Sequence, residues 1–188
     1  GIVLTLGDLQ DRNDIPALSD LEAVDQNGLF LAGEVTGYAL IRTAVQHGKR
    51  VAAEVAARLV SGPAPASSDQ KMLDLCIIGA GPAGLSCSLE AKRLGLDFVT
   101  LEQQSLGGTV AKYPRRKLVM TQPLQLPLGP ALKSKTYQKE ELIDLWQRLS
   151  LEHQLPIQQQ VTVQAVEKLE DGSFEVRTGK QTLRARFV

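Results

Sequence analysis

The chain has 188 residues and a mass of 20.4 kDa, the size of one domain or of one domain with an appendage. Hydrophobic residues make up 43% and charged residues 22%, close to ordinary globular usage, which excludes collagen, coiled-coil and disulfide-scaffold classes. Because 21 Lys and Arg balance 21 Asp and Glu, and no apolar run reaches about 18 residues, we expect no nucleic-acid partner, no membrane association and a cytoplasmic location.

The stretch 61–71 is rich in Ser, Gly, Pro and Ala, which predicts a linker between residues 1–60 and 72–188. In the first part, residues 1–7 and 28–33 are short apolar runs bounded by glycine, typical of buried strands. Apolar residues at three- and four-residue steps then predict an amphipathic helix over 39–59. Gly48 inside that helix predicts a close approach of another backbone.

The second part opens with a βαβ pattern. A buried-strand run over 73–78 is followed by a glycine turn and by a helical pattern that ends at Gly95. Residues 98–102 predict the next strand, so parallel strands should follow.

A second amphipathic helix is predicted over 139–149. Residues 161–169, 173–178 and 182–188 alternate polar and apolar between glycine turns, which predicts a three-stranded antiparallel meander. The expected fold class is α/β, a Rossmann-like domain with a central parallel sheet, helices on both faces and the meander covering one side.

The central motif is G-x-G-x-x-G at residues 79–84. Gly79 allows a tight turn, Gly81 lets the backbone approach a pyrophosphate, and Gly84 lets the helix pack closely; the helix N-terminus adds amides and partial positive charge. Glu102 ends the next strand, where a carboxylate accepts hydrogen bonds from an adenosine ribose. The alternative is a glycine turn in an unrelated α/β protein, with Glu102 merely solvated.

The cysteines and the basic run give no clear evidence of a further functional site. Cys76 and Cys87 lie in apolar stretches without C-x-x-C spacing, so we expect buried core residues rather than a redox pair or a metal site. The run 115–117 (Arg-Arg-Lys) is most simply a solvated face, and attraction of an anionic substrate or an NADPH phosphate is the alternative.

Two separated segments resemble one family. Residues 75–85, with Glu102 and the Gly-Gly-Thr at 107–109, resemble the N-terminal FAD-binding stretch of thioredoxin-reductase-like flavoproteins. Residues 28–37 resemble their C-terminal FAD motif, in which an acid, here Glu34 in place of Asp, binds the ribityl and pyrophosphate side. Residues 113–128 and the helix at 141–146 look most like the bacillithiol-disulfide-reductase-like branch.

Motif and resemblance together assign a set of residues to FAD and name no catalytic side chain and no metal ligand. The assigned residues are Gly33, Glu34, Gly79, Gly81, Pro82, Ala83, Gly84, Glu102, Gln103, Gly107, Gly108, Thr109 and Val161. The resemblance also points the 39–59 helix at the flavin, where His47 is more simply a packing histidine than a proton donor.

The order of the two motifs is inverted relative to that family, and the sequence has no second glycine-rich βαβ fingerprint for a nicotinamide-nucleotide domain. Residues 1–60 resemble the tail of one flavoprotein unit and residues 72–188 the head of another. The chain therefore spans the joint of a tandem protein, or it is a circular permutant whose pieces form about one FAD domain. We expect a homodimer formed by segment exchange through the 61–71 linker, with closure inside one chain as the alternative.

The resemblance implies an FAD-dependent oxidoreductase in which NAD(P)H reduces the flavin and the flavin reduces a small-molecule substrate, a disulfide or a quinone-like acceptor. Without a redox dithiol, we do not expect thioredoxin reduction by this chain. The rival hypotheses are a non-catalytic FAD-binding or dimerisation module, and an NAD-dependent dehydrogenase, which leaves residues 28–37 unexplained.

Overall fold

The computed structural model describes residues 18–37, 40–61 and 72–188. The strand predicted at residues 1–7 lies outside the described residues, as does the linker after Ser61.

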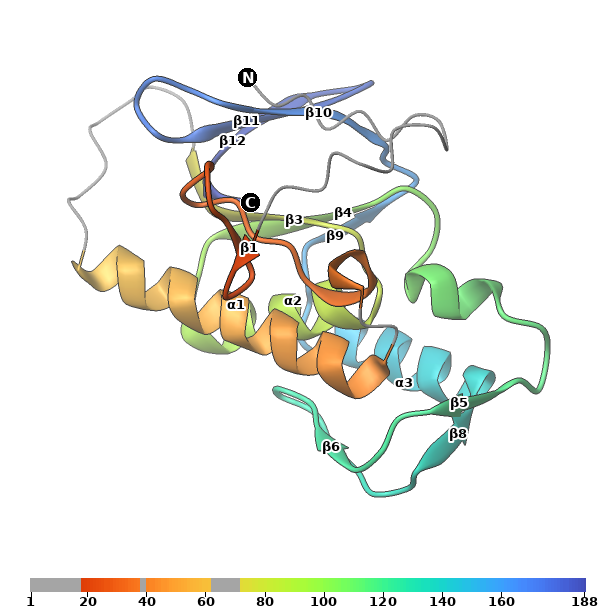
Figure 1. The fold of residues 1–188 in the computed structure, drawn as a ribbon. Coiled ribbons are helices and arrows are strands. Elements are labelled where there is room, and N and C mark those ends of the chain that lie inside the picture. Colours follow the sequence, from red (N-terminus) through yellow and green to blue (C-terminus); the bar gives the residue numbers. More distant parts are fainter. Residues whose placement is uncertain (1–17, 38–39, 62–71) are drawn as a thin grey trace.

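A six-stranded sheet forms the centre of the molecule, in the order β10-β11-β12-β3-β4-β9 (Figure 1). Strands β12, β3, β4 and β9 are parallel, and β10, β11 and β12 form an antiparallel meander. The predicted parallel sheet with an attached meander is therefore confirmed. The strands are β3 (Met72–Ile78), β4 (Phe98–Glu102), β9 (Ile157–Gln159), β10 (Val163–Lys168), β11 (Phe174–Thr178) and β12 (Thr182–Phe187).

Three helices pack on one face of the sheet: α1 (Ile41–Ser61), α2 (Pro82–Leu94) and α3 (Lys139–Glu152) (Figure 1). Their buried side chains share one apolar cluster with Leu75 of β3. The opposite face carries Cys76 and Val99, which cluster with meander residues such as Phe174. For the described residues, the expectation of helices on both faces is therefore wrong, because the meander already covers the second face.

Local signals explain where the helices begin and end. Pro82 opens α2 at a position where its missing N–H costs nothing. Gly95 ends α2 in the left-handed conformation, as predicted. The Gln138 and Glu141 side chains form a reciprocal capping box at the start of α3.

Helices α1 and α2 lie against each other with almost no space between their backbones. A β-carbon on Gly48 would lie 2.0 Å from the carbonyl oxygen of Ala83, which confirms the close approach predicted at this glycine. The Ser86 hydroxyl donates a 2.7 Å hydrogen bond to the carbonyl of Val45. The helix from the first part of the chain is thus fixed directly against the glycine-motif helix of the second.

The run 28–33 forms less strand than predicted. Only Phe30 makes a β-bridge, to Glu22, although the run lies beside the end of β12. The amide of Phe30 donates to the Val188 carbonyl at 2.8 Å, and the Val188 amide donates to Gly28 at 3.1 Å. The chain then turns at Gly33, whose φ is +82°, so the paired stretch is too short to become a strand.

Short elements complete the fold. They are β1 (Leu18–Ser19), β2 (Glu22–Ala23), the 3₁₀ helices η1 (Gly33–Thr36) and η2 (Gly108–Lys112), β5 (Leu118–Met120), β6 (Leu124–Gln125), β7 (Ala131–Leu132) and β8 (Thr136–Gln138). Within the described ranges, no helix combines the length and the apolar character needed to cross a bilayer.

Candidate cofactor site

The turn between β3 and α2 is fastened to the end of β4. The Gly79 amide donates to the carbonyl of Leu101 at 2.7 Å, and the Ala80 amide donates to Oε2 of Glu102 at 2.8 Å. Gly79 has a φ of +96°, which only glycine adopts at low cost. The first backbone N–H groups of α2, which have no partner within a helix, therefore lie at a fixed turn.

The three motif glycines serve different purposes. A β-carbon at Gly84 would lie 1.9 Å from the carbonyl oxygen of Gly79, so this glycine permits the turn and helix to touch. A β-carbon at Gly79 or Gly81 would meet no atom within 4 Å. The β-carbon direction at these two positions is therefore open space that a ligand can enter, while the Gly81 backbone lies close to Gly108, where an added β-carbon would be 3.2 Å from the Gly81 Cα.

A cavity of about 340 Å³ lies over this turn and is lined by both parts of the chain. The first part contributes η1 and the start of α1, and the second contributes the glycine turn, the end of β4 and η2. Most of the residues predicted to bind the cofactor line it, namely Gly33, Glu34, Gly79, Gly81, Pro82, Ala83, Gly84, Glu102, Gln103, Gly108 and Thr109. The structure thus brings together two motifs that are far apart in the sequence.

Two predicted residues, Gly107 and Val161, do not line the cavity. The Gly107 amide donates to the carbonyl of Ala80 at 2.9 Å, and a β-carbon there would lie 2.3 Å from Cδ1 of Ile143. The Val161 amide donates to the carbonyl of Glu102 at 3.0 Å. Both residues hold the cavity's walls in place.

Glu102 is buried, with both carboxylate oxygens in contact with backbone amides. Oε2 accepts from Ala80, and Oε1 accepts from Gln104 at 2.8 Å. Each carboxylate oxygen can accept a further hydrogen bond. Glu102 therefore organises the turn in addition to its predicted contact with a ribose.

The first part of the chain is held at the cavity by His47. The Gly33 amide donates a long hydrogen bond, 3.4 Å, to Nδ1 of His47, a contact that requires this nitrogen to be unprotonated. Burial, together with the positive charge of Arg50, lowers the pKa of His47 below its ordinary value. His47 does not line the cavity, which favours the packing role over that of a proton donor.

Sequence reasoning missed a group of apolar and mixed residues around the motifs. They are Ala32, Val35, Leu40, Ile41, Ala44, Ile78, Val110, Lys112 and Tyr113. Val35, Leu40 and Ile78 are each at least 40% exposed, so the cavity has an apolar wall accessible to a ligand. In the sequence, these residues lie close to one of the two motifs or to the Gly-Gly-Thr at 107–109, and this proximity could have identified them as lining residues.

Neither cysteine is placed for redox chemistry. Cys76 and Cys87 are free and buried, and burial raises the pKa of each thiol to about 12. Among the described residues, no group of three or more His, Cys, Asp or Glu side chains could hold a metal ion.

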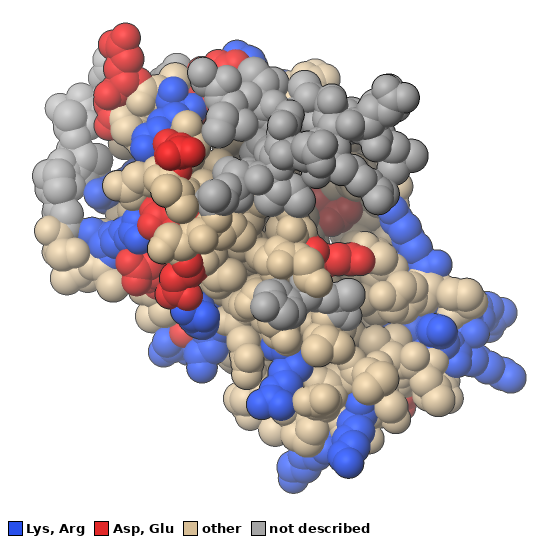
Figure 2. All heavy atoms as spheres, viewed as in Figure 1, with Lys and Arg blue, Asp and Glu red and all other residues tan. Residues whose placement is uncertain are grey.

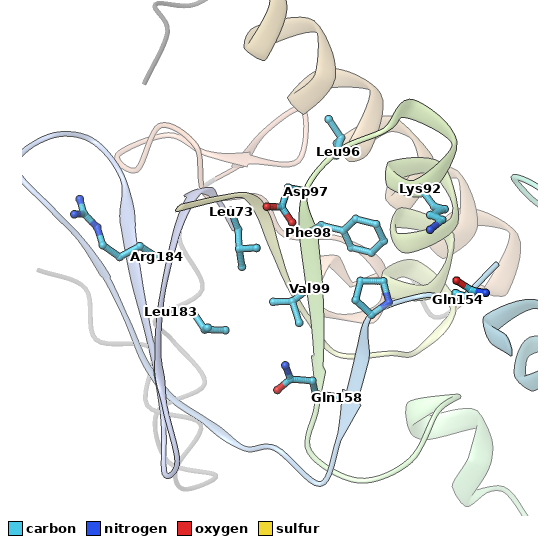
Figure 3. Close-up of a pocket in the computed structure, with 11 residues that line it drawn as sticks. Leu73, Lys92, Leu96, Asp97, Phe98, Val99, Gln154, Gln158, Leu183 and Arg184 are labelled. Atoms are coloured by element: carbon cyan, nitrogen blue, oxygen red, sulfur yellow. The ribbon is translucent and has the colours of Figure 1, made fainter. Parts of the chain in front are cut away.

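A second cavity, of about 540 Å³, lies where β3 and β4 begin, at the opposite ends of these strands from the glycine turn (Figure 3). Figure 3 shows Val99 and Leu183 pointing into it and Arg184 pointing away. Two of its polar side chains have protein partners: Gln158 accepts from Gln181 at 2.8 Å, and one terminal nitrogen of Arg184 donates to Asp171 and Ser173, although the Arg184 Nε is buried without a hydrogen-bond partner among the described residues. It contains none of the predicted site residues, all but two of which line the smaller cavity.

Residues 76–188 match the pyridine nucleotide-disulphide oxidoreductase family. The chain belongs to that family. This family assignment agrees with the cavity, because the matched residues carry the glycine turn, Glu102 and η2.

Comparisons with single proteins agree with this family assignment. The chain is 51% identical to a thioredoxin reductase of Ureaplasma parvum over 43 residues, which are 23% of this chain and 14% of that protein. It is 34% identical to a ferredoxin–NADP reductase of Lactococcus lactis over 118 residues, 62% of this chain and 33% of that one.

A bacillithiol disulfide reductase of Staphylococcus aureus superposes on 60% of this chain with a TM-score of 0.54 and 25% identity, covering 35% of its own length. The thioredoxin-reductase-like resemblance is therefore confirmed. The chain spans between 14% and 35% of the length of these three proteins.

Proposed function

We propose that this chain binds FAD in the 340 Å³ cavity and is the flavin-binding part of an NAD(P)H-dependent oxidoreductase that reduces a small disulfide or quinone-like acceptor. The observation that carries the proposal is that both FAD-type motifs, Gly33-Glu34 and Gly79–Gly84, line one cavity although they are 45 residues or more apart in the sequence (79 − 34 = 45).

The residues present suit the parts of a flavin dinucleotide. Gly79 and Gly81 offer open backbone, and the N-terminus of α2 offers amides and partial positive charge for a pyrophosphate. Glu102 and Gln103, at the end of β4, suit the ribose hydroxyls.

The flavin ring requires a different wall. The exposed apolar side chains of Val35, Leu40 and Ile78 supply a surface that a flat aromatic ring would cover. Glu34, exposed at the start of η1, would accept hydrogen bonds from the ribityl chain that joins the flavin ring to the pyrophosphate. FAD would supply the electron chemistry, and these residues would bind it, orient it and exclude water from one side.

Flavin retention tests the binding claim. Gly81→Val should abolish flavin absorbance after desalting, because a branched side chain would fill the open space over the turn. The protein should remain folded by circular dichroism, since no protein atom lies within 4 Å of the new β-carbon. Gly179→Val, at a turn remote from the cavity, is the matched control and should stay yellow. A yellow Gly81→Val protein would contradict the proposal.

Anaerobic titration with NADPH tests whether this chain alone can pass hydride from NADPH to the bound flavin. Hydride transfer requires the reacting atoms to be held about 3–3.5 Å apart, and the sequence has no second dinucleotide motif to hold a nicotinamide. We expect slow, unsaturable bleaching of the bound flavin. Rapid and saturable bleaching would instead show that these 188 residues form a complete enzyme.

A further inference from the structure

Strand β5 exposes two large apolar side chains on one face. Leu118 is 63% exposed and Met120 is 62% exposed, whereas Val119 between them is buried at 7%. Side chains alternate along a strand, so Leu118 and Met120 project to the same side. Together they form a small contiguous apolar patch, and an exposed apolar patch marks an interaction surface when polar residues surround it.

Positive side chains lie at both ends of this apolar pair. Strand β5 runs antiparallel to β8, with Leu118 opposite Gln138 and Met120 opposite Thr136. The run 115–117 (Arg-Arg-Lys) therefore lies at one end, and Lys133 and Lys135, which precede β8, lie at the other. Figure 2 shows Lys and Arg gathered over this part of the molecule, with few Asp or Glu among them.

These five cations form no ion pair with any described residue. Two carboxylates lie nearby at the start of α3. Glu140 accepts from the Arg116 amide at 3.1 Å, and its backbone hydrogen bonds, together with the positive charge of Arg115, lower its pKa. Glu141 accepts from the Gln138 amide at 2.6 Å, so two carboxylates face five cations. The surface around Leu118 and Met120 therefore keeps an excess of positive charge.

The same surface adjoins the mouth of the cofactor cavity. Lys112 and Tyr113 line that cavity, and the chain continues from them directly into the basic run. On the other side, Arg42 at the start of α1 donates a 3.0 Å hydrogen bond to Gln122, just after β5.

We propose that the β5–β8 patch, defined as Arg115, Arg116, Lys117, Leu118, Met120, Lys133 and Lys135, docks an acidic segment of another protein that also carries apolar side chains. An apolar centre between charged ends is the composition of a protein interface, and the unpaired cations select a partner of opposite charge. A small anion would leave Leu118 and Met120 uncovered.

Fluorescence anisotropy with the full chain tests this inference. The probe is a labelled peptide that alternates Glu with Leu, and binding should weaken at high salt because exposed charges are screened. Leu118→Ser with Met120→Ser should weaken binding about tenfold or more. Lys133→Gln with Lys135→Gln should weaken it and reduce its dependence on salt.

Matched controls keep the result specific. Val60 and Leu151 are 90% and 79% exposed and lie on α1 and α3, away from the patch, so Val60→Ser with Leu151→Ser should leave binding unchanged. Circular dichroism checks that every variant is folded.

Three results would overturn the inference: equal binding of an all-Glu peptide, binding that the patch variants leave intact, or patch-dependent binding of phosphatidylserine vesicles in preference to the peptide. The measurement is repeated on flavin-free protein, where the same outcome is expected. Failure of the peptide to bind would therefore count against the β5–β8 patch alone, and failure to retain flavin would count against the FAD site alone.

Discussion

Gly84 and Gly81, three residues apart, face opposite constraints. A β-carbon at Gly84 would lie 1.9 Å from a backbone oxygen that cannot move cheaply, whereas one at Gly81 would enter open space. Gly84→Ala should therefore lower the free energy of unfolding by about 1–3 kcal/mol. Gly81→Ala should change it by less than about 0.5 kcal/mol. Urea unfolding of flavin-free protein measures both, and equal stabilities would contradict the geometry.

The two cysteine thiols should be inert in the folded protein. Burial raises both pKa values to about 12, and the thiolate is the reactive form. Titration with a disulfide reagent at pH 8 should give no fast reaction before urea is added. Rapid labelling of either thiol in native protein would show that the site is open.

The same pKa shifts predict a loss of stability in alkali. Because the folded protein holds its thiols neutral, their contribution is complete below the unfolded pKa and is lost as pH rises from about 9 towards 12. Cys76→Ala with Cys87→Ala should flatten this part of the pH profile, measured by urea unfolding. A profile with the same slope in both proteins would contradict the assignment.

At the residue scale, spacing was enough to find Glu102 and the glycines, because a βαβ unit fixes where a strand ends. Spacing could not show that the amides of Ala80 and Gln104 share the Glu102 carboxylate. It also missed Leu40 and Ile78, since an apolar residue is read as core until its exposure is known.

At the element scale, the junction of η1 with α1 includes one hydrogen bond that forms only while Nδ1 of His47 is unprotonated. Protonated His47 cannot accept the Gly33 amide. Its lowered pKa means that the contribution is complete above the ordinary value of 6.5 and is lost as pH falls through the folded value. FAD affinity should therefore weaken in mild acid.

His47→Asn provides the control for this prediction, because the Asn side-chain oxygen occupies the position of the imidazole Nδ1 and can accept the Gly33 amide without titrating. FAD affinity measured against pH should lose its acidic decline in the variant. An identical decline in both proteins would exclude His47 as its source.

Element prediction succeeded where a pattern was long. The periodic helix α1 and the alternating strands of the meander are confirmed. The sidedness of the helices was not predictable, because it depends on the meander bending over the second face. Strands of two or three residues, such as β5 to β8, are too short to show any period.

At the scale of the whole molecule, residues 41–61 pack against 82–94 within one chain. The linker sequence from Ser61 to Lys71 has 71 − 61 + 1 = 11 residues and reaches at most about 36–40 Å, so the same contacts can form between two copies. We propose the exchanged homodimer as the assembly in solution.

Light scattering on dilute, flavin-bound protein measures this assembly. The proposal predicts a mass near twice 20.4 kDa, and dissociation when Gly48→Ala disturbs the α1–α2 contact. A persistent mass near 20.4 kDa would contradict exchange and leave closure within one chain.

The most direct measurement is an equilibrium titration of flavin-free protein with FAD, followed by flavin fluorescence, in the native chain and in one variant of each motif. If both parts of the chain form one site, FAD should bind once per chain. Val35→Glu in the first part and Gly81→Val in the second should each abolish binding, since both residues line the same cavity. Undiminished binding in the Val35→Glu protein would contradict a site shared between the two motifs.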